Sequence, residues 1–312
     1  MKGFIWNIES ETQFKDVVRD DYSRVVFLDG KINEQFGVEI KYLSDTEKQE
    51  TVDAFEKGKT DIDKDDVSYY INKYGARGDW SIEEQKNDHL KIAVFGCSFT
   101  FGVGMPESKT WAAQFVQKLQ VDKPVQLINL GYPGGSIAKN LKHFKYLTDI
   151  YKIDMAVFLL PTHWREEYPD YYTSDHPVTY YNFIPNYGFK YKKEKWEQFY
   201  SYSTAGTRFY DMVKMISYIE LIASVKNIET YYSSWDEQTL NFIREHKLVK
   251  LYQILPYFKF LETMVVPHFN NKFARDGFHP GIASQDLFSS ELADHISSKT
   301  LIQGIFKKIK VI

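Results

Sequence analysis

The 312-residue chain contains a single cysteine, Cys97, and no long apolar run. One cysteine cannot form a disulfide within the chain, so the fold does not depend on an oxidising compartment. Without about 18 consecutive apolar residues, no transmembrane helix is predicted and no membrane partner is expected. The first residues, MKGFIWNIESETQF, lack the apolar core of a signal peptide. We therefore expect a cytoplasmic protein, either free or incorporated into a larger particle.

An excess of charge of one sign is also missing. The chain carries 39 Lys and Arg residues against 42 Asp and Glu residues, a formal net charge of −3. Such a balance gives no general attraction to nucleic acid, so nucleic acid is not an expected partner. The histidines are widely spaced, with no HxxxH or HExxH pattern. The sequence therefore predicts neither a metal site nor another cofactor.

Aromatic residues, by contrast, are abundant. Tyr and Phe occur 23 times each, and aromatic residues make up 17% of the chain. Two explanations stay open: rings that fill the protein core, or a surface that stacks on sugars or on a partner. The chain length and an apolar content of 43% fit one large globular domain with additions. Nothing in the sequence predicts the oligomeric state.

A regular alternation of strands and helices begins near residue 90. Three apolar runs, at 91–96, 125–130 and 153–161, are typical of strands buried on both faces of a parallel sheet. Amphipathic helices are predicted between them, and a fourth strand is predicted at 228–234. This order predicts an α/β fold in which helices cover a parallel sheet.

Two segments stand outside this pattern. Residues 1–65 include a charge-dense stretch, and we assign them as an N-terminal extension of unknown role before the main domain at 66–312. Residues 165–203 are rich in aromatic and turn-forming side chains and are predicted to form a long insertion. Ordered insertions of this length often act as lids or binding loops.

A serine follows the first predicted buried strand. In KIAVFGCSFT, Ser98 lies on the turn before the next helix, at the sheet edge where open α/β proteins bind ligands. A neutral hydroxyl needs a base to act as a nucleophile. His279, in the loop before the last predicted helix, is a candidate base, and Asp276 lies close enough to orient its ring. Cys97 is interpreted as a small buried residue, because neighbours on an extended strand point to opposite faces.

These residues carry a resemblance to a known family. GCSFTFGVG, INLGYPGGS and the pair Asp276-x-x-His279 resemble the sequence blocks of the SGNH hydrolases, also called GDSL esterases and lipases. The upstream NKYGARGDW resembles a lead-in found in a subgroup, so the resemblance spans roughly residues 66–298. It implies a flavodoxin-like three-layer α/β/α sandwich with a Ser98–His279–Asp276 triad. It also implies an oxyanion hole formed by the N–H groups of Ser98 and Gly131.

Two positions depart from the family pattern. Cys97 stands where the family has Asp, which leaves the triad intact. The sequence after the third strand is LLPTHWREE, without the Asn that the family uses as an oxyanion donor. Thr162, His163 or Arg165 can replace it. His163 is the best substitute, since a ring N–H can donate, but it can equally pack beneath the insertion. The loss of one such donor lowers turnover by about 10²–10³.

Together these features predict a serine esterase that removes a short acyl group, acetyl in the first instance, from a small molecule or a glycan. Arg165, Tyr171 and Tyr172 are the candidate substrate-binding residues, because side chains of this kind suit sugar faces and hydroxyls. Two alternatives stay open. One is an SGNH-like binding or assembly module with a decayed site, and the other is an acyltransferase that uses a sugar acceptor.

Overall fold

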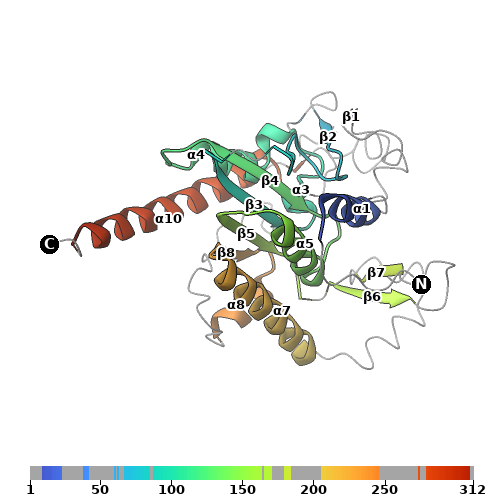
Figure 1. Cartoon of the computed structure of the whole chain (residues 1–312). Coiled ribbons are helices and arrows are strands. Elements are labelled where there is room, and N and C mark those ends of the chain that lie inside the picture. Colours follow the sequence, from blue (N-terminus) through green and yellow to red (C-terminus); the bar gives the residue numbers. More distant parts are fainter. Residues whose placement is uncertain are drawn as a thin grey trace.

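A four-stranded parallel sheet forms the centre of the molecule (Figure 1). The computed structural model describes residues 9–22, 38–41, 60, 62, 67–84, 87–163, 165–170, 179–183, 205–245, 273–274 and 279–309. The strands lie in the order β4-β3-β5-β8, which becomes 2-1-3-4 when they are numbered along the chain. This is the order of flavodoxin-like sheets. The four strands are β3 (Leu90–Gly96), β4 (Val125–Gly131), β5 (Met155–Leu160) and β8 (Glu229–Ser234).

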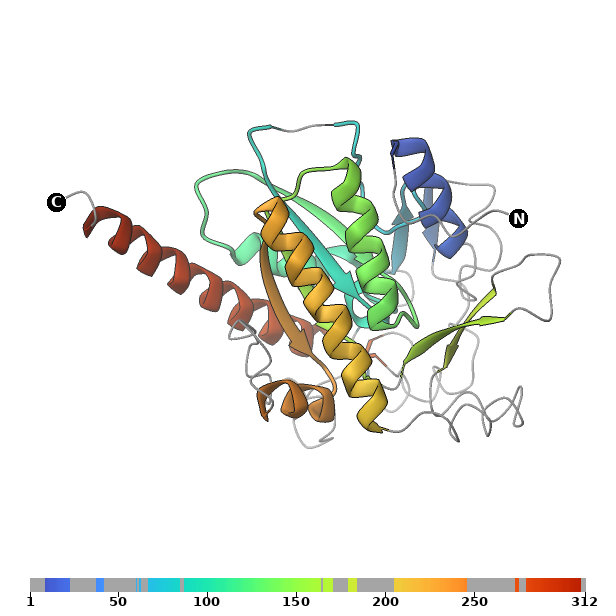
Figure 2. The same ribbon diagram turned by 60° about the horizontal axis from the view of Figure 1, so that its bottom comes forward.

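Helices cover both faces of this sheet, so the predicted three-layer α/β/α arrangement is confirmed. On one face α5 (Ile137–Ile150) and α7 (Ala205–Lys226) lie side by side (Figure 2). On the other face α4 (Trp111–Lys118) packs against α10 (Ile282–Ile309). The side chain of Ser136 caps α5 by accepting from Lys139 N at 3.1 Å.

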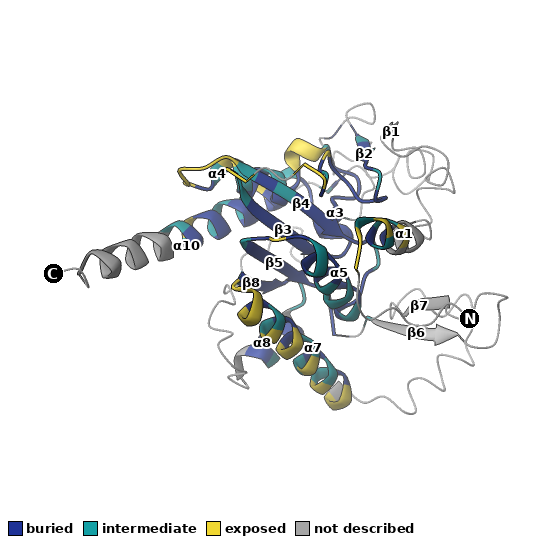
Figure 3. Cartoon of the chain, viewed as in Figure 1, coloured by how far each residue is buried: buried dark blue, intermediate teal, exposed yellow. Residues whose placement is uncertain are grey.

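Side chains of β3 alternate between the two faces, as the pleat of a strand requires. Ala93 and Phe95 belong to the core beneath α5 and α7, whereas Ile92 and Val94 belong to the core beneath α4 and α10. Figure 3 shows the central strands as buried and the outward side of α7 as exposed. Burial on both faces explains why the strands read as continuous apolar runs in the sequence.

A ladder of stacked rings crosses the sheet. Phe95, Phe158 and Tyr232 occupy registered positions on β3, β5 and β8. Their ring centroids lie 4.8 Å apart between Phe95 and Phe158 and 5.1 Å apart between Phe158 and Tyr232. Phe144 of α5 closes the ladder edge-on against Phe95 at 5.6 Å. Part of the aromatic abundance therefore fills the core.

The N-terminal region shares this core in part. α1 (Glu11–Tyr22) buries Phe14 and Val18 completely in the cluster that also contains residues of α5. Tyr74 Oη donates to Glu11 Oε1 at 2.6 Å, and the Phe14 and Tyr74 rings meet edge-on at 5.5 Å. β1 (Val38–Lys41) pairs antiparallel with β2 (Ser68–Ile71). The domain boundary at residue 65 stays a prediction.

The remaining described elements lie outside the central sheet. In the predicted insertion, β6 (Glu166–Asp170) and β7 (Thr179–Phe183) form an antiparallel pair. The short elements are α3 (Ser98–Phe101), the 3-10 helix η4 (Glu107–Lys109) and α8 (Glu237–Glu245). Residues 25–30, whose sequence VVFLDG is typical of a short strand, lie outside the described residues. Across the described ranges, no helix combines the length and apolarity needed to cross a bilayer.

Candidate active site

Ser98 is the first residue of α3, a single helical turn directly after β3. Cys97 O accepts hydrogen bonds from Thr100 N and Phe101 N, each at 3.0 Å, and Ser98 O accepts from Gly102 N at 2.8 Å. These bonds hold Ser98, only 7% exposed, at the carboxyl end of the sheet. Cys97 is fully buried among the apolar residues beneath α4, in agreement with its interpretation as a core residue.

The NKYGARG segment supports this turn through a buried arginine. Arg77 Nη1 donates to Phe101 O at 2.9 Å and also to Gly102 O, and Nη2 donates to Met105 O at 2.7 Å. The guanidinium carbon lies 4.5 Å from the centre of the Tyr69 ring. Burial lowers the pKa of Arg77, and the carbonyl oxygens compensate for part of the lost hydration. Arg77 therefore holds the carboxyl end of the nucleophile turn in place.

Gly131, at the end of β4, packs directly against α3. A Cβ at this position would lie 2.3 Å from Phe101 N, which only glycine avoids. The Gly131 N–H donates to Asn129 Oδ1 at 2.9 Å, and Asn129 Nδ2 donates to Thr100 O at 3.0 Å. This N–H is engaged in the structure, so the oxyanion role that the family resemblance implies requires exchange of the Asn129 bond and stays a prediction. Its role in this structure is close packing.

The turn after β4 offers a different backbone donor. Gly135 N donates to Tyr132 O at 2.8 Å, and Gly134 between them has a φ of +76°. This closed turn is tied to β3, because Tyr132 N donates to Gly96 O at 3.0 Å. Within the described part of the chain, the N–H of Gly134 makes no hydrogen bond. The Pro-Gly pair in the sequence was the signal for such a turn.

His279 contacts the nucleophile turn through Phe99. Its ring lies edge-on to the ring of Phe99, the residue after Ser98, with centroids 5.3 Å apart. His279 O accepts from Ala274 N at 2.8 Å, which anchors the backbone of this loop. Ser98 and His279, which are both described, share no hydrogen bond in this structure. Asp276 lies outside the described residues, so the assignment of the third triad member stays a prediction.

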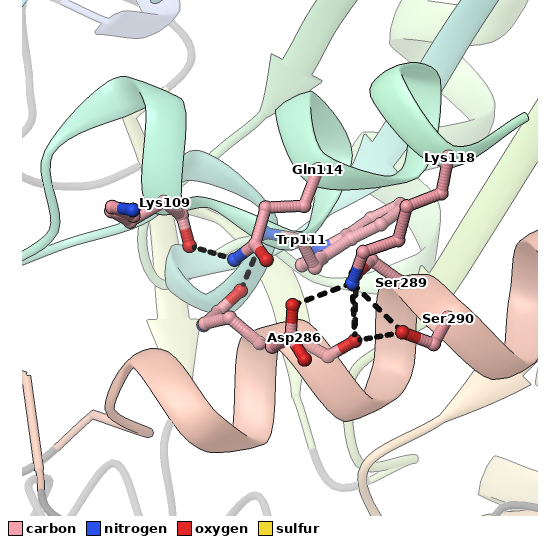
Figure 4. Close-up of polar contacts among 8 residues, drawn as sticks. Lys109, Trp111, Gln114, Lys118, Asp286, Ser289 and Ser290 are labelled. Atoms are coloured by element: carbon pink, nitrogen blue, oxygen red, sulfur yellow. Dashed lines mark hydrogen bonds and ion pairs between the residues drawn. The ribbon is translucent and has the colours of Figure 1, made fainter.

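α10, which begins just after His279, is fixed to α4, which begins shortly after the Ser98 turn. Gln285 Oε1 accepts from Trp111 N at 2.8 Å. Lys118 Nζ donates to three side chains of α10 (Figure 4): Asp286 Oδ1 at 2.6 Å, Ser289 Oγ at 2.7 Å and Ser290 Oγ at 2.8 Å. These contacts join the start of α10, just after His279, to α4.

His163 lies in the packing between β5, α7 and α8. Its ring stacks on the Phe209 ring with centroids 4.0 Å apart, and Nδ1 lies 3.1 Å from Thr239 Oγ1 and 3.4 Å from Asp236 Oδ2. Burial alone would raise the pKa of Asp236, but hydrogen bonds from His163 and Thr239 outweigh it and lower that pKa. The side chain of His163 is 0% exposed, so the packing alternative describes it better than the oxyanion-donor alternative. Thr162 is buried too, and its carbonyl accepts from Arg165 N at 3.1 Å.

Arg165 reaches the nucleophile turn through Trp235, a residue that no sequence pattern singled out. The guanidinium carbon lies 5.1 Å from the centre of the Trp235 ring, and that ring stacks on Phe99 with centroids 5.0 Å apart. Trp235 directly follows β8, and its position at a predicted strand end was the available signal. Tyr171 and Tyr172 lie outside the described residues. No group of three or more His, Cys, Asp or Glu residues suited to a metal ion occurs among the described side chains.

Comparison with known proteins finds similarity only to solved structures. No family model and no curated protein matches the chain. It is similar to TesA, with 14% identity over 65% of this chain and 95% of that chain and a TM-score of 0.41. It is also similar to the psychrotrophic esterase EstA from Pseudoalteromonas sp., with 13% identity over 69% and 99% of the two chains and a TM-score of 0.40. Identities and TM-scores this low do not assign the chain to a family.

Proposed function

We propose that the chain is an ester hydrolase of the SGNH type with Ser98 as the nucleophile. The observation that supports this proposal is the edge-on contact of the His279 ring with Phe99, the residue after Ser98, at the carboxyl edge of a parallel sheet. Open α/β sheets bind their ligands at this edge. The backbone bonds of the turn present Ser98 in one orientation, as a nucleophile requires.

In the proposed reaction His279 takes the proton from Ser98 Oγ while the oxygen attacks the ester carbonyl. His279 then gives the proton to the leaving alcohol, and water hydrolyses the acyl-enzyme with the same base. Asp276 orients the imidazole and stabilises the imidazolium. The hydrogen bond between Ser98 and His279 forms when substrate binds, since catalytic hydrogen bonds commonly tighten only in the complex.

The oxyanion is held by two backbone N–H groups in this proposal. Ser98 contributes the first, at the start of α3, and Gly131 contributes the second once its N–H exchanges the bond to Asn129 for the oxyanion. His163 is too deeply buried to add a third donor. Because each missing donor costs about 10²–10³ in turnover, we expect a slow enzyme.

The proposed substrate is a short-chain acyl ester, acetyl in the first instance, of a small molecule or a glycan. Trp235, a partly exposed ring that stacks on Phe99 next to Ser98, supports the glycan alternative, because aromatic rings suit sugar faces. Transfer of the acyl group to a sugar acceptor needs the same nucleophile and base. A binding module without activity is the second candidate, and the missing hydrogen bond between Ser98 and His279 is the observation that favours it.

A fluorophosphonate probe with peptide mapping tests the nucleophile, because this reagent modifies activated serines. We expect an adduct on Ser98 that disappears in Ser98→Ala and in His279→Ala. Ser108→Ala, a change of an exposed serine in η4, keeps the adduct and serves as the matched control. A wild-type protein that melts cooperatively but takes up no probe rejects the hydrolase and supports the binding module.

A further inference from the structure

Three hydrogen-bond donors without acceptors lie beside the nucleophile turn. Arg165 Nε, Arg165 Nη1 and Trp235 Nε1 are buried atoms that have no hydrogen-bond partner. Arg165 also forms no ion pair with any carboxylate in the described part of the chain. Both residues are only partly buried, so each keeps a surface that a ligand can approach.

The chemistry of these atoms defines which ligand group would satisfy them. A buried donor without an acceptor loses its hydration and gains nothing in return, and the penalty is larger for a charged group. All three atoms are donors, so the missing partner is an acceptor. Guanidinium groups prefer carboxylate and phosphate oxygens, to which they form short, charge-assisted hydrogen bonds. An anionic group therefore fits this place better than a neutral one.

The position of these donors links them to the proposed reaction. The Arg165 guanidinium lies over the Trp235 ring, and Trp235 stacks on Phe99, which touches the His279 ring. Phe99 is the neighbour of Ser98 in the chain. Arg165 is therefore separated from Ser98 by the rings of Trp235 and Phe99. The group that meets Arg165 is a remote part of the substrate and not the ester itself.

We propose that Arg165 and the indole N–H of Trp235 bind a carboxylate of the substrate, so that the enzyme prefers anionic esters to neutral ones. This inference rests on the proposed function, because it assigns the specificity of that same site. It places the glycan alternative among sugars that carry an acid group. The formal net charge of −3 disfavours general attraction of anions, so any preference has to come from a local site.

Matched esters test this specificity. 3-Acetoxybenzoate and 3-acetoxybenzamide place the charge on the alcohol part, and p-nitrophenyl hydrogen succinate and p-nitrophenyl pentanoate place it on the acyl part. In one of the two pairs, depending on which part of the ester faces Arg165, we expect the anionic ester to have a higher kcat/KM than its neutral partner. In Arg165→Met the ratio of anionic to neutral kcat/KM falls roughly 10- to 100-fold. Arg165→Lys keeps the charge without the planar donor set and retains part of the ratio.

A charge-matched control comes from the other end of the sheet. Lys123 is exposed and lies just before β4, at the amino end of that strand, whereas Arg165 follows the carboxyl end of β5. Lys123→Met removes the same charge and leaves the ratio unchanged. If Arg165→Met and Arg165→Lys both melt like the wild type and both keep the full ratio, the carboxylate site is rejected and the donors are assigned to water.

Binding without turnover separates this proposal from the hydrolase itself. Isothermal titration of Ser98→Ala with 3-hydroxybenzoate should show binding that an added Arg165→Met weakens roughly 10- to 100-fold. The neutral probe 3-hydroxybenzamide should not discriminate between the two proteins. Binding through Arg165 in a protein that hydrolyses none of the four esters would support the anion site while rejecting the hydrolase. Equal binding of 3-hydroxybenzoate to both proteins rejects the anion site, whatever the hydrolase assay shows.

Discussion

Two turns that follow the two central strands use their hydrogen bonds in opposite ways. After β3, the turn at 97–105 directs its carbonyl groups to its own backbone and to Arg77. After β5, the turn that ends at Arg165 leaves two guanidinium nitrogens without acceptors. A turn satisfied from within holds a reactive group in one position. A turn whose donors have no acceptor can form new hydrogen bonds when a ligand binds.

The two turns also differ in how they are anchored. The β3 turn is held by a residue from the upstream segment, Arg77, and by Asn129 of the neighbouring strand. The β5 turn is held at its start by His163, which Thr239 and Asp236 of the α8 region bind. Positioning of a nucleophile requires rigid anchoring, as in the β3 turn. Recognition of a substrate requires donors that are open to it, as in the β5 turn.

Removal of the Arg77 side chain is the strongest way to break the satisfied turn. Arg77→Met removes the guanidinium donors from the carbonyls of Phe101, Gly102 and Met105. We expect the free energy of unfolding to fall by about 3–5 kcal/mol, because several hydrogen bonds to a charged group are lost together. Urea denaturation followed by circular dichroism measures this change. Arg77→Lys should recover part of the loss, and an unchanged midpoint in Arg77→Met would contradict the supporting role.

A methyl group at Gly131 would clash with the same turn from β4. In Gly131→Ala the new Cβ meets Phe101 N, a backbone atom that cannot rotate away. We expect a loss of about 1–3 kcal/mol and a displaced Ser98, and therefore lower esterase activity per folded molecule. Gly206→Ala, an exposed position in the first turn of α7, should be neutral or slightly stabilising. Equal melting temperatures for the two variants would rule out the close contact.

Asp236 tests the anchor of the β5 turn and gives it a pH dependence. Asp236→Asn weakens the cap of α8 and the contact with His163, at a cost of about 1–2 kcal/mol at neutral pH. The folded-state pKa of Asp236 is lowered, so its contribution is complete above the unfolded value of about 3.9 and is lost as the pH falls through the folded pKa. Urea denaturation at several pH values should show the gap between wild type and Asp236→Asn narrowing below about pH 4. A gap that stays constant from neutral pH down to about pH 3 would show that the carboxylate charge is not involved.

Substitution of Lys118 is expected to have the smallest effect on stability. Lys118 contacts neither the β3 turn nor the β5 turn, so it tests whether α10 influences the site from a distance. Lys118→Met removes the ammonium group that joins α4 to Asp286, Ser289 and Ser290 of α10. We expect a stability loss of about 1 kcal/mol, since the ammonium is partly exposed. Because α10 follows His279, labelling of Ser98 by fluorophosphonate should slow more than stability alone explains. The exposed Lys152→Met provides the control, and equal labelling rates in both variants would argue against coupling through α10.

Much of the fold could be predicted because its signals are local. The apolar runs at 91–96, 125–130 and 153–161 became β3, β4 and β5, and the helix expected after His279 became α10. Patterns of this kind depend only on the spacing of residues along the chain. The antiparallel pair β6–β7 was not predicted, because the aromatic and turn-rich residues around it gave no clear period of two.

The site could be predicted only in part. Ser98 and His279 could be proposed as site residues because each follows or precedes an element whose end is visible in the sequence. The sequence did not predict three features: the hydrogen bond of the Gly131 N–H, the burial of His163 and the contact of Arg165 with the Trp235 ring. A hydrogen bond can be assigned to a donor only when its acceptor is known, and most of these partners come from other elements of the chain.

The sequence by itself determined the strands, the helices and the edge of the sheet at which Ser98 and His279 lie, since periodicity and turn residues act over a few positions. Only the tertiary structure decided which donors are satisfied and which are left open. The two terminal nitrogens of Arg77 donate to carbonyls of the nucleophile turn, whereas Arg165 lies over an aromatic ring and pairs with no carboxylate among the described residues. The two arginines look alike in the sequence, and their different roles follow from the groups that folding brings beside each of them.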